Sequence, residues 1–314
     1  MVLSEGVDLS SRPPPPPGEA VRLPPMDTAL AIDIGGTKLA AGIVSGDGAL
    51  LHRDEAPTPA TADAEVLFAA LIGLVEALPP AAHAVCGAGC GGPMTRGGEE
   101  VSPLNIPAWR HFPLRRRLQQ ATGLPVFVDN DAKALTLGEG WVGAATGEQN
   151  FIGMVVSTGV GGGIVLDGGL LNGAQGNAGH IGHMVVEPGG RRCVCGSRGC
   201  LEAEASGLAI RAITGRPPAE APAAVVARTG MLVGRAVASV ANLLDLRLAV
   251  VAGSVALGFG QPFFEAAQQE IDALARREFS VGTRIVPAGL GAAAPLIGAA
   301  AVGFRGASSF HPAP

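Results

Sequence analysis

The pattern of apolar and polar positions repeats once along the chain, and each copy predicts an antiparallel pair of strands. In the first copy, an apolar run over residues 29–34 ends in a Gly-Gly-Thr turn, and residues 39–51 then follow as strand, turn and strand. In the second copy, residues 151–171 have the same plan, with a polar glycine turn between two apolar runs. The repeat predicts two similar lobes that each begin with a hairpin.

The rest of the sequence alternates between helical and strand patterns. Residues 62–78 have apolar positions at helical spacing and stop at two prolines, and residues 113–123 form a predicted helix that Gly123 closes. Further strands are predicted at residues 84–90, 125–131 and 248–258, the last with a glycine-serine turn. An apolar helix over residues 292–304 is expected to return to the first lobe. The alternation indicates an α/β fold.

The composition is that of a two-lobed globular protein. The chain has 314 residues, of which 47% are hydrophobic, and this length suffices for two cores. The net charge of −5 and the lack of a basic stripe exclude a nucleic-acid partner, and the run Arg115–Arg117 is interpreted as a solvated helix face. No apolar run reaches the roughly 18 residues of a membrane span, and no secretory signal is evident. Residues 1–27 are predicted to be a disordered, proline-rich leader, and a cytoplasmic location is expected.

Three glycine loops at strand ends have the character of phosphate-binding loops. They occupy residues 33–38, 157–163 and 252–258. Glycine lets backbone N–H groups approach a phosphate without a Cβ in the way, and the hydroxyls of Thr37 and Thr158 can add donors. Asp33 is a candidate Mg²⁺ ligand through water, because hard cations prefer carboxylate oxygen. Three ordinary β-turns are the alternative, but their joint occurrence favours a nucleotide.

The sequence Val-Asp-Asn-Asp at residues 128–131 follows a predicted strand and precedes a helix. A carboxylate here can accept the proton of a sugar hydroxyl during phosphoryl transfer. Asn130 offers both a donor and an acceptor to a hydroxyl-rich ligand. The alternative is a plain helix N-cap, for which aspartate and asparagine are favoured.

Three cysteines and a histidine indicate a metal site. Cys193, Cys195, Cys200 and His183 form a complete tetrahedral donor set for structural Zn²⁺. A disulfide is disfavoured in an intracellular protein, and a redox role lacks the usual Cys-x-x-Cys spacing. The other two cysteines, Cys86 and Cys90, are interpreted as small core residues. A zinc clamp in this glycine-rich region is expected to hold His180 and Glu202 rigidly toward a substrate cleft.

Taken together, these motifs resemble the ROK family of repressors and kinases. The resemblance covers about residues 28–305 and rests on DIGGTK, NIPAW, DNDAKALTLGEGWVGAATG, STGVGGGIV, the histidine-cysteine block and AGSVALG. It implies the duplicated actin-like ATPase fold, of the ribonuclease H-like type, with two lobes and a cleft between them. It divides the chain into a small lobe at 28–128, completed by a helix at about 296–314, and a large lobe at 129–295. The zinc-binding loop would be residues 180–202.

The resemblance implies a sugar kinase that uses ATP and Mg²⁺ to phosphorylate the 6-hydroxyl of a hexose, with Asp131 as the catalytic base. The sugar contacts implied are Asn105, Asn130, Asp131, His180, His183 and Glu202. The ATP and Mg²⁺ contacts implied are Asp33, Gly35, Gly36, Thr37, Lys38, Thr158, Gly159, Gly161, Gly253 and Ser254. His183 would serve twice, with one ring nitrogen on zinc and the other toward the sugar. Family members are commonly dimers or tetramers.

One position departs from the family pattern. Where the family usually has Glu-x-Gly-His, this chain has His180-Ile181-Gly182-His183. An imidazole in place of a carboxylate changes charge and hydrogen-bond direction, and histidine here is found in some bacterial N-acetylmannosamine kinases of the family. The substitution favours an N-acetylated hexosamine as the substrate, with glucose as the alternative.

Two non-enzymatic functions are also considered. A sugar-sensing regulator of the same family would carry a DNA-reading helix-turn-helix before the kinase-like part, and the proline-rich residues before the first strand do not fit one. A catalytically silent sugar-binding protein would not need Asp131 and all three loops. Both are therefore less favoured than the kinase.

Overall fold

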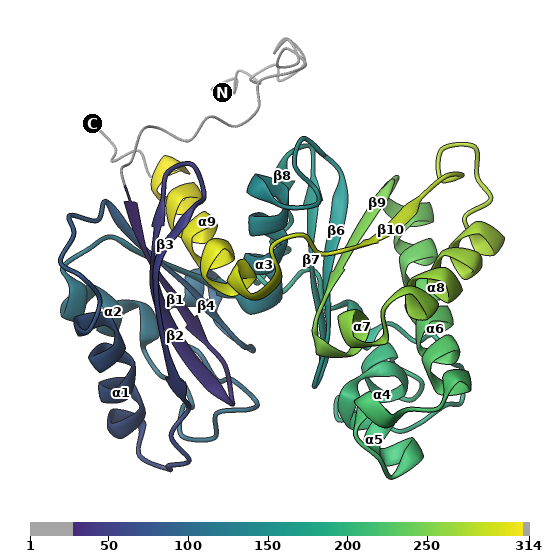
Figure 1. Ribbon diagram of the computed structural model, residues 1–314, viewed down its shortest axis with the longest axis horizontal. Coiled ribbons are helices and arrows are strands. Elements are labelled where there is room, and N and C mark those ends of the chain that lie inside the picture. The colour runs from purple at the N-terminus through teal and green to yellow at the C-terminus, as the bar shows by residue number, and fades with distance from the viewer. Residues whose placement is uncertain (1–27, 310–314) are drawn as a thin grey trace, which may run out of the picture.

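The computed structural model describes residues 28–309, which form two lobes, each built on a five-stranded sheet (Figure 1). The predicted leader, residues 1–27, and residues 310–314 lie outside the described residues. Helices α3 (Asp131–Val142) and α9 (Ala294–Ser309) lie between the two sheets and pack against each other (Figure 1). They therefore join the two lobes.

The first sheet combines the N-terminal hairpin with two parallel strands. Its strands are β1 (Thr28–Ile34), β2 (Lys38–Ser45), β3 (Leu50–Pro57), β4 (Val85–Cys90) and β5 (Val126–Asn130). Their order is β3-β2-β1-β4-β5, with β2 antiparallel to β1 and β3, and with β4 and β5 parallel to β1. The lobe boundary at residue 128 stays a prediction. Since β5 belongs to this sheet and ends at Asn130, we place the boundary two residues later.

The second sheet repeats this topology. Its strands are β6 (Phe151–Val156), β7 (Val160–Leu166), β8 (Gly169–Leu170), β9 (Leu248–Ala252) and β10 (Arg284–Pro287). Their order is β10-β9-β6-β7-β8, again with two antiparallel pairings on one side of the first strand and two parallel pairings on the other. The duplication predicted from the sequence repeat is confirmed.

The first lobe buries both faces of its sheet. Helices α1 (Ala64–Glu76) and α2 (Leu114–Thr122) share a core with Leu30 and Ile32, whereas α9 packs against the alternate residues Ala29 and Ala31. This division follows from the period of two along a strand. The C-terminal apolar helix α9 thus packs on the first sheet, and its assignment to the first lobe stays a prediction. Cys86 and Cys90 are fully buried in β4, as expected of core residues.

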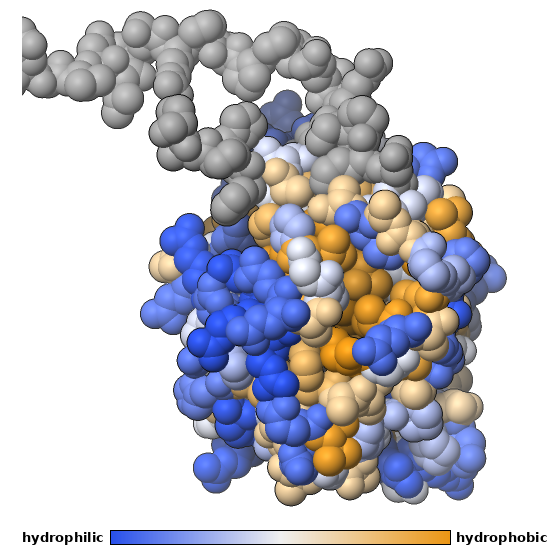
Figure 2. Space-filling view, turned by 90° about the vertical axis from the view of Figure 1, so that its left-hand side faces the viewer, coloured by the Kyte–Doolittle hydropathy of each residue, from blue (hydrophilic) through white to orange (hydrophobic). Residues whose placement is uncertain are grey.

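The outer surface of this lobe mixes apolar and strongly hydrophilic areas (Figure 2). The arginine run at residues 115–117 differs from the solvated face predicted for it. Arg116 is exposed, but Arg117 lies over the ring of Phe68, 4.4 Å from its centroid, and pairs with Glu65. The arginine stem and guanidinium thus cover aromatic surface as well as meeting water.

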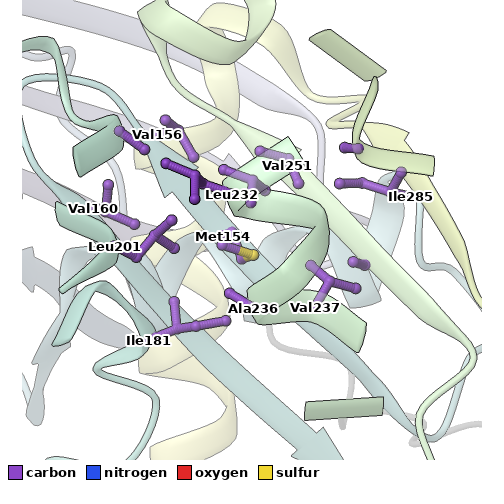
Figure 3. Close-up of a cluster of buried hydrophobic side chains, with 14 of the residues drawn as sticks. Met154, Val156, Val160, Ile181, Leu201, Leu232, Ala236, Val237, Val251 and Ile285 are labelled. Carbon is purple, nitrogen blue, oxygen red and sulfur yellow. The ribbon is translucent and has the colours of Figure 1, made fainter. Parts of the chain in front are cut away.

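The second lobe has its core between β6, β9 and α6 (Ala223–Leu244), which packs in turn on α8 (Gln261–Leu274). In Figure 3, Met154 and Val251 of the sheet lie against Leu232, Ala236 and Val237 of α6. The shorter helices are α4 (Leu201–Ala205), α5 (Gly207–Thr214) and α7 (Ser254–Phe259), with 3-10 turns at Arg96–Gly98, Ile181–His183, Pro218–Glu220 and Gly291–Ala293. Within the described residues, only α6 has the length and apolarity of a membrane span, and 56% of that stretch is buried in the protein.

The prediction of a glycine loop over residues 252–258 is wrong for the residues after Gly253. Strand β9 ends at Ala252 and α7 begins at Ser254, so most of this segment is helix. Gly253 makes the corner with a φ of 102°, and a Cβ there would lie 2.3 Å from the Val156 carbonyl oxygen. Only glycine fits such a backbone at so close an approach. The third loop is therefore a strand-to-helix corner.

Candidate active site

Asp33 and Asp131 lie at the C-terminal end of the parallel strands of the first sheet, on either side of β4. Asp33 is near the end of β1, and Asp131 follows β5 directly as the first residue of α3. The Oδ1 atom of Asp33 and the Cα atom of Asp131 are each 3.7 Å from the point where a Cβ of Gly89 would stand. The carboxyl ends of β1, β4 and β5 thus bring together two carboxylates that are distant in sequence.

The protein around both carboxylates disfavours their ionised forms. Desolvation, followed by the charge of Asp131, raises the pKa of Asp33 to about 7, although Lys38 and Arg53 act in the opposite direction. Desolvation also raises the pKa of Asp131, while hydrogen bonds from backbone amides and the charge of His180 lower it. The Asp131 residue is nevertheless exposed to solvent. Asp131 is therefore open to solvent on one side, while the protein around it makes its ionised form less favourable than in water.

The first glycine loop is fixed by its own hydrogen bonds and places Asn105 beside it. The Gly35 N–H donates to the Lys38 carbonyl at 3.0 Å, and the Thr58 hydroxyl donates to the Gly35 carbonyl at 2.6 Å. A Cβ on Gly36 would lie 2.5 Å from the Cβ of Asn105. Glycine at this position therefore lets Asn105, which is exposed, lie directly against the loop.

Thr37 and Lys38 lie at the exposed end of this hairpin. The Thr37 carbonyl accepts the Thr58 N–H at 3.1 Å. Thr37 itself is exposed to solvent. The Lys38 ammonium lies 3.1 Å from the Glu55 carboxylate, which also pairs with Arg53. The charged groups near the first loop are thus the cations of Lys38 and Arg53 and the carboxylates of Asp33 and Glu55.

The second glycine loop lies at the corresponding edge of the second sheet. The Ser157 N–H donates to the Gly159 carbonyl at 2.9 Å, and Thr158 between them is exposed. The Ser157 hydroxyl lies 2.9 Å from the Ser254 hydroxyl, so this loop adjoins the corner at Gly253. Two of the three predicted phosphate-binding segments are therefore neighbours.

Gly161 connects this loop to the helix that carries Asp131. A Cβ on Gly161 would be 3.1 Å from the Cβ of Ala132 in the first turn of α3. The strand after the second loop therefore packs directly beside the start of that helix. The two loops and Asp131 belong to one region of the molecule.

Asn130 is the N-cap of α3. Its side-chain oxygen accepts the Ala132 N–H at 3.0 Å, and the Asp131 carboxylate accepts the same N–H at 2.8 Å. The N-cap alternative from the sequence thus holds for Asn130. The cap uses only the side-chain oxygen of Asn130 and so does not exclude a role of its amide nitrogen in sugar binding. That nitrogen lies 3.6 Å from the Cβ position of Gly92, on the loop that follows β4.

His180, His183 and Glu202 converge on the region of Asp131. The rings of His180 and His183 are 6.1 Å apart and nearly parallel. Burial lowers the pKa of His180, and His183 lowers it further, whereas the charges of Asp131 and Glu202 raise it. The Glu202 carboxylate accepts the Val160 N–H at 3.0 Å, within the second glycine loop. The imidazole of His180 is therefore largely neutral at neutral pH, although the charges of Asp131 and Glu202 act on it.

The predicted metal ligands form a tight cluster. The donor atoms of His183, Cys193, Cys195 and Cys200 all lie within 4.8 Å of one another, and the cysteines are unpaired. The Cys193 sulfur is 3.6 Å from Nδ1 of His183, and the sulfurs of Cys195 and Cys200 are 3.7 Å apart. Ligand atoms around a tetrahedral Zn²⁺ are roughly 3.3–3.8 Å apart. The donor set fits zinc, and the use of Nδ1 leaves Nε2 of His183 on the other side of the ring.

Glu204 supports this cluster and does not stand out in the sequence. Its carboxylate is buried, accepts the Arg191 N–H at 2.6 Å and pairs with Arg228 at 2.8 Å. It therefore ties the cysteine loop to α6. A glutamate two residues after Glu202 gives no sequence signal of this role, because its partners come from distant segments.

Glu139 is a second buried carboxylate that the sequence patterns do not reveal. It lies in α3 and accepts three backbone N–H groups, those of Ala144, Gly289 and Leu290, at 2.8–3.1 Å. Several amide donors satisfy a buried carboxylate in place of water. Glu139 thereby joins the end of α3 to the segment that enters α9.

The comparisons with known proteins agree with this geometry. The sequence signature of the ROK family matches residues 29–303. An N-acetylmannosamine kinase of Escherichia fergusonii is 40% identical over 250 residues, which cover 74% of this chain and 85% of that protein. The crystal structure of a ROK hexokinase from Thermus thermophilus superimposes with a TM-score of 0.77 at 34% identity, covering 90% of this chain and all of that one. A ROK family glucokinase from Streptomyces griseus, solved with glucose and AMPPNP, gives 0.75 at 30% identity, covering 88% and 99%.

The duplicated sheets and the likeness to these solved kinases define a two-lobed protein of the actin-like ATPase fold. Within that fold, the chain belongs to the ROK family.

Proposed function

We propose that this protein is an ATP-dependent sugar kinase that transfers the γ-phosphoryl group to the 6-hydroxyl of N-acetylmannosamine. The observation that carries the proposal is that Asp131, at the start of α3, lies beside Asp33 of the first glycine loop, while the next residue, Ala132, packs against Gly161 of the second, and that Asp131 interacts with His180. The 40% identity to an N-acetylmannosamine kinase supports the choice of sugar.

Asp131 is the proposed base. Its carboxylate accepts the proton of the sugar hydroxyl while that oxygen attacks the γ-phosphorus and the bond to the β-phosphate oxygen breaks. The N-cap geometry holds the carboxylate at the helix start, because Asp131 and Asn130 share the Ala132 N–H. Asn105 beside the first loop, Asn130 and Glu202 are the proposed contacts to the other sugar hydroxyls, with Nε2 of His183.

The proposed triphosphate contacts are the backbone and hydroxyl groups of the two loops and the Gly253–Ser254 corner. At Gly36 and Gly159 a Cβ would lie within 2.8 Å of Asn105 and Glu202 atoms, so only glycine lets the two loops pass this close to the proposed sugar contacts. Asp33 offers carboxylate oxygens suited to Mg²⁺, which would shield the phosphate charge. A cation there also favours the ionised form of Asp33, whose pKa is otherwise about 7.

The proposed zinc role is structural. Four protein donors leave no open position for a water or substrate. Bound zinc would fix His183 and, through it, the turn that carries His180. The chain's own residues then hold the sugar.

His180 is the proposed determinant of sugar preference. A largely neutral imidazole offers one donor and one acceptor, whereas the glutamate usual in the family offers two acceptors. A donor can bond the carbonyl oxygen of an N-acetyl group. Glucose remains the second candidate, because the Streptomyces griseus relative is named a glucokinase and binds glucose.

A panel of N-acetylmannosamine, N-acetylglucosamine, mannose and glucose with ATP and Mg²⁺ tests the proposal. We expect the highest kcat/KM for N-acetylmannosamine, and His180→Glu should shift the preference toward glucose. His52→Glu, at an exposed residue of β3, is the matched control and should leave the order unchanged. A wild-type preference for glucose would establish the second candidate. No turnover of any of the four sugars would contradict the kinase.

We further propose that the protein works as a homodimer or homotetramer in the cytoplasm, where ATP is available. Light scattering of the purified chain tests the first point, and a monomeric mass at working concentration would contradict it.

A further inference from the structure

Lys133 is a buried cation whose three ammonium protons all have acceptors. Only 3% of its side chain is exposed, and Nζ lies 2.8 Å from the Asp129 carboxylate. It also donates to Oδ1 of Asn172 at 2.9 Å and to the carbonyl oxygen of Gly176 at 3.1 Å. An ammonium has three donors that point in different directions, which matches these three acceptors. A planar guanidinium has a different geometry, and the chain uses arginine at all but one of its other cationic positions.

The three acceptors come from both lobes. Asp129 belongs to β5 of the first sheet, whereas Asn172 and Gly176 lie in the segment that follows β8 of the second sheet. Lys133 itself is two residues after Asp131 in α3. One side chain of the helix of the proposed base thus connects β5 of the first sheet to the loop after β8 of the second.

That loop leads directly to His180. It is closed on itself by the Ala178 N–H, which donates to the Asn172 carbonyl at 3.0 Å, so residues 172–178 form one unit. Gly179 then passes against β7 with a φ of 100°, where a Cβ would lie 2.5 Å from the Gly162 carbonyl oxygen. His180 follows. A displacement of residues 172–178 would therefore move His180.

The loop also meets the first lobe. A Cβ on Gly176 would lie 3.6 Å from the Cα of Arg96, in the loop after β4. A small cavity of about 200 Å³ lies at this junction and is lined by Arg96, Asp129, Lys133 and Asn172 among others. The loop therefore leaves a space beside the first lobe, and the ammonium of Lys133 bridges Asp129 and the loop at its border.

We propose that Lys133 is a positioning residue that holds the His180 segment against the helix that begins at Asp131. This rests on the proposed sugar kinase function. The ammonium does not touch the reacting atoms. Its role is to hold residues 172–178, and with them His180, at a fixed distance from Asp131. Loss of the ammonium would leave the Asp129 carboxylate unpaired and residues 172–178 without this contact.

The test compares Lys133→Met with Lys133→Arg and with a control, Arg117→Met. Arg117 is a partly buried, ion-paired cation on the far side of the first lobe, so it reports general destabilisation. In Lys133→Met, backbone hydrogen exchange over residues 173–180 should become about tenfold faster or more. The KM for the sugar should rise about tenfold or more, while the KM for ATP stays within about threefold. Lys133→Arg should recover part of the sugar affinity, and Arg117→Met should change neither quantity.

If Lys133→Met fails to fold, Asn172→Ala replaces it in the test, because it removes one acceptor of the ammonium. It should give the same faster exchange and the same rise in the KM for the sugar, both smaller. Unchanged exchange over residues 173–180, or an equal rise in both KM values, would overturn the role of Lys133. The exchange measurement needs no turnover. It therefore tests the anchor even if the wild-type protein phosphorylates none of the sugars, an outcome that contradicts only the proposed function.

Discussion

Asp33 and Asp131 flank Gly89, and the charge of Asp131 raises the pKa of Asp33. Two carboxylates in one desolvated site do not ionise independently. Each ionised carboxylate therefore makes it harder for the other to ionise, and a cation beside Asp33 would relieve this repulsion.

The pH dependence of activity follows from Asp131. Its pKa is raised, mainly by desolvation, so the ionised base is lost as pH falls through a value above the ordinary 3.8. We expect kcat/KM for the sugar to fall on the acid side with a midpoint above that of a free aspartate, measured at saturating Mg²⁺. Activity that stays constant down to about pH 4 would contradict this assignment.

Asp33 should reduce stability when it is ionised without a cation. Its folded-state pKa of about 7 exceeds the ordinary 3.8, so the folded protein loses stability as pH rises between these values. Without added Mg²⁺, Asp33→Asn should therefore stabilise the fold by on the order of 4 kcal/mol at pH 8, and by progressively less toward about pH 4. Urea unfolding at both pH values measures the gain. A gain that does not depend on pH would count against the shifted pKa, and Asp272→Asn, at an exposed site on α8, should show no gain.

Zinc binding should depend on the four clustered donors and on no other cysteine. Purified protein should contain about one zinc per chain, and Cys200→Ser should lose it with a fall of several degrees in Tm. Cys86→Ala, at a buried cysteine in β4, is the matched control and should retain the metal although it also loses stability. Metal-free wild-type protein, or equal zinc loss in both variants, would contradict the clamp.

Much of the fold could be predicted because its signals are local. The repeated apolar-glycine-apolar pattern predicts both hairpins, and the prolines after residue 78 and Gly123 mark helix ends that the structure places at Glu76 and Thr122. The four metal donors lie within a short stretch of sequence, and the structure brings them together.

The unpredicted features depend on long-range contacts. Glu139, Glu204 and Lys133 act through partners on other elements, and nothing in their immediate sequence distinguishes them from surface charges. The segment after Gly253 carries glycines and small residues like a loop, yet it is helical. Its N-terminal side packs between β9 and the second glycine loop, and this tertiary contact outweighs local propensity.

The most direct test of the account is turnover by Asp131→Asn with N-acetylmannosamine, saturating ATP and Mg²⁺. Asparagine keeps the size of aspartate and an oxygen that can accept the Ala132 N–H, but it does not take a proton. We predict that kcat falls by about 100-fold or more while calorimetry shows sugar affinity within about tenfold of wild type. A kcat within about tenfold of wild type would contradict the assignment of Asp131 as the base and, with it, the proposed mechanism.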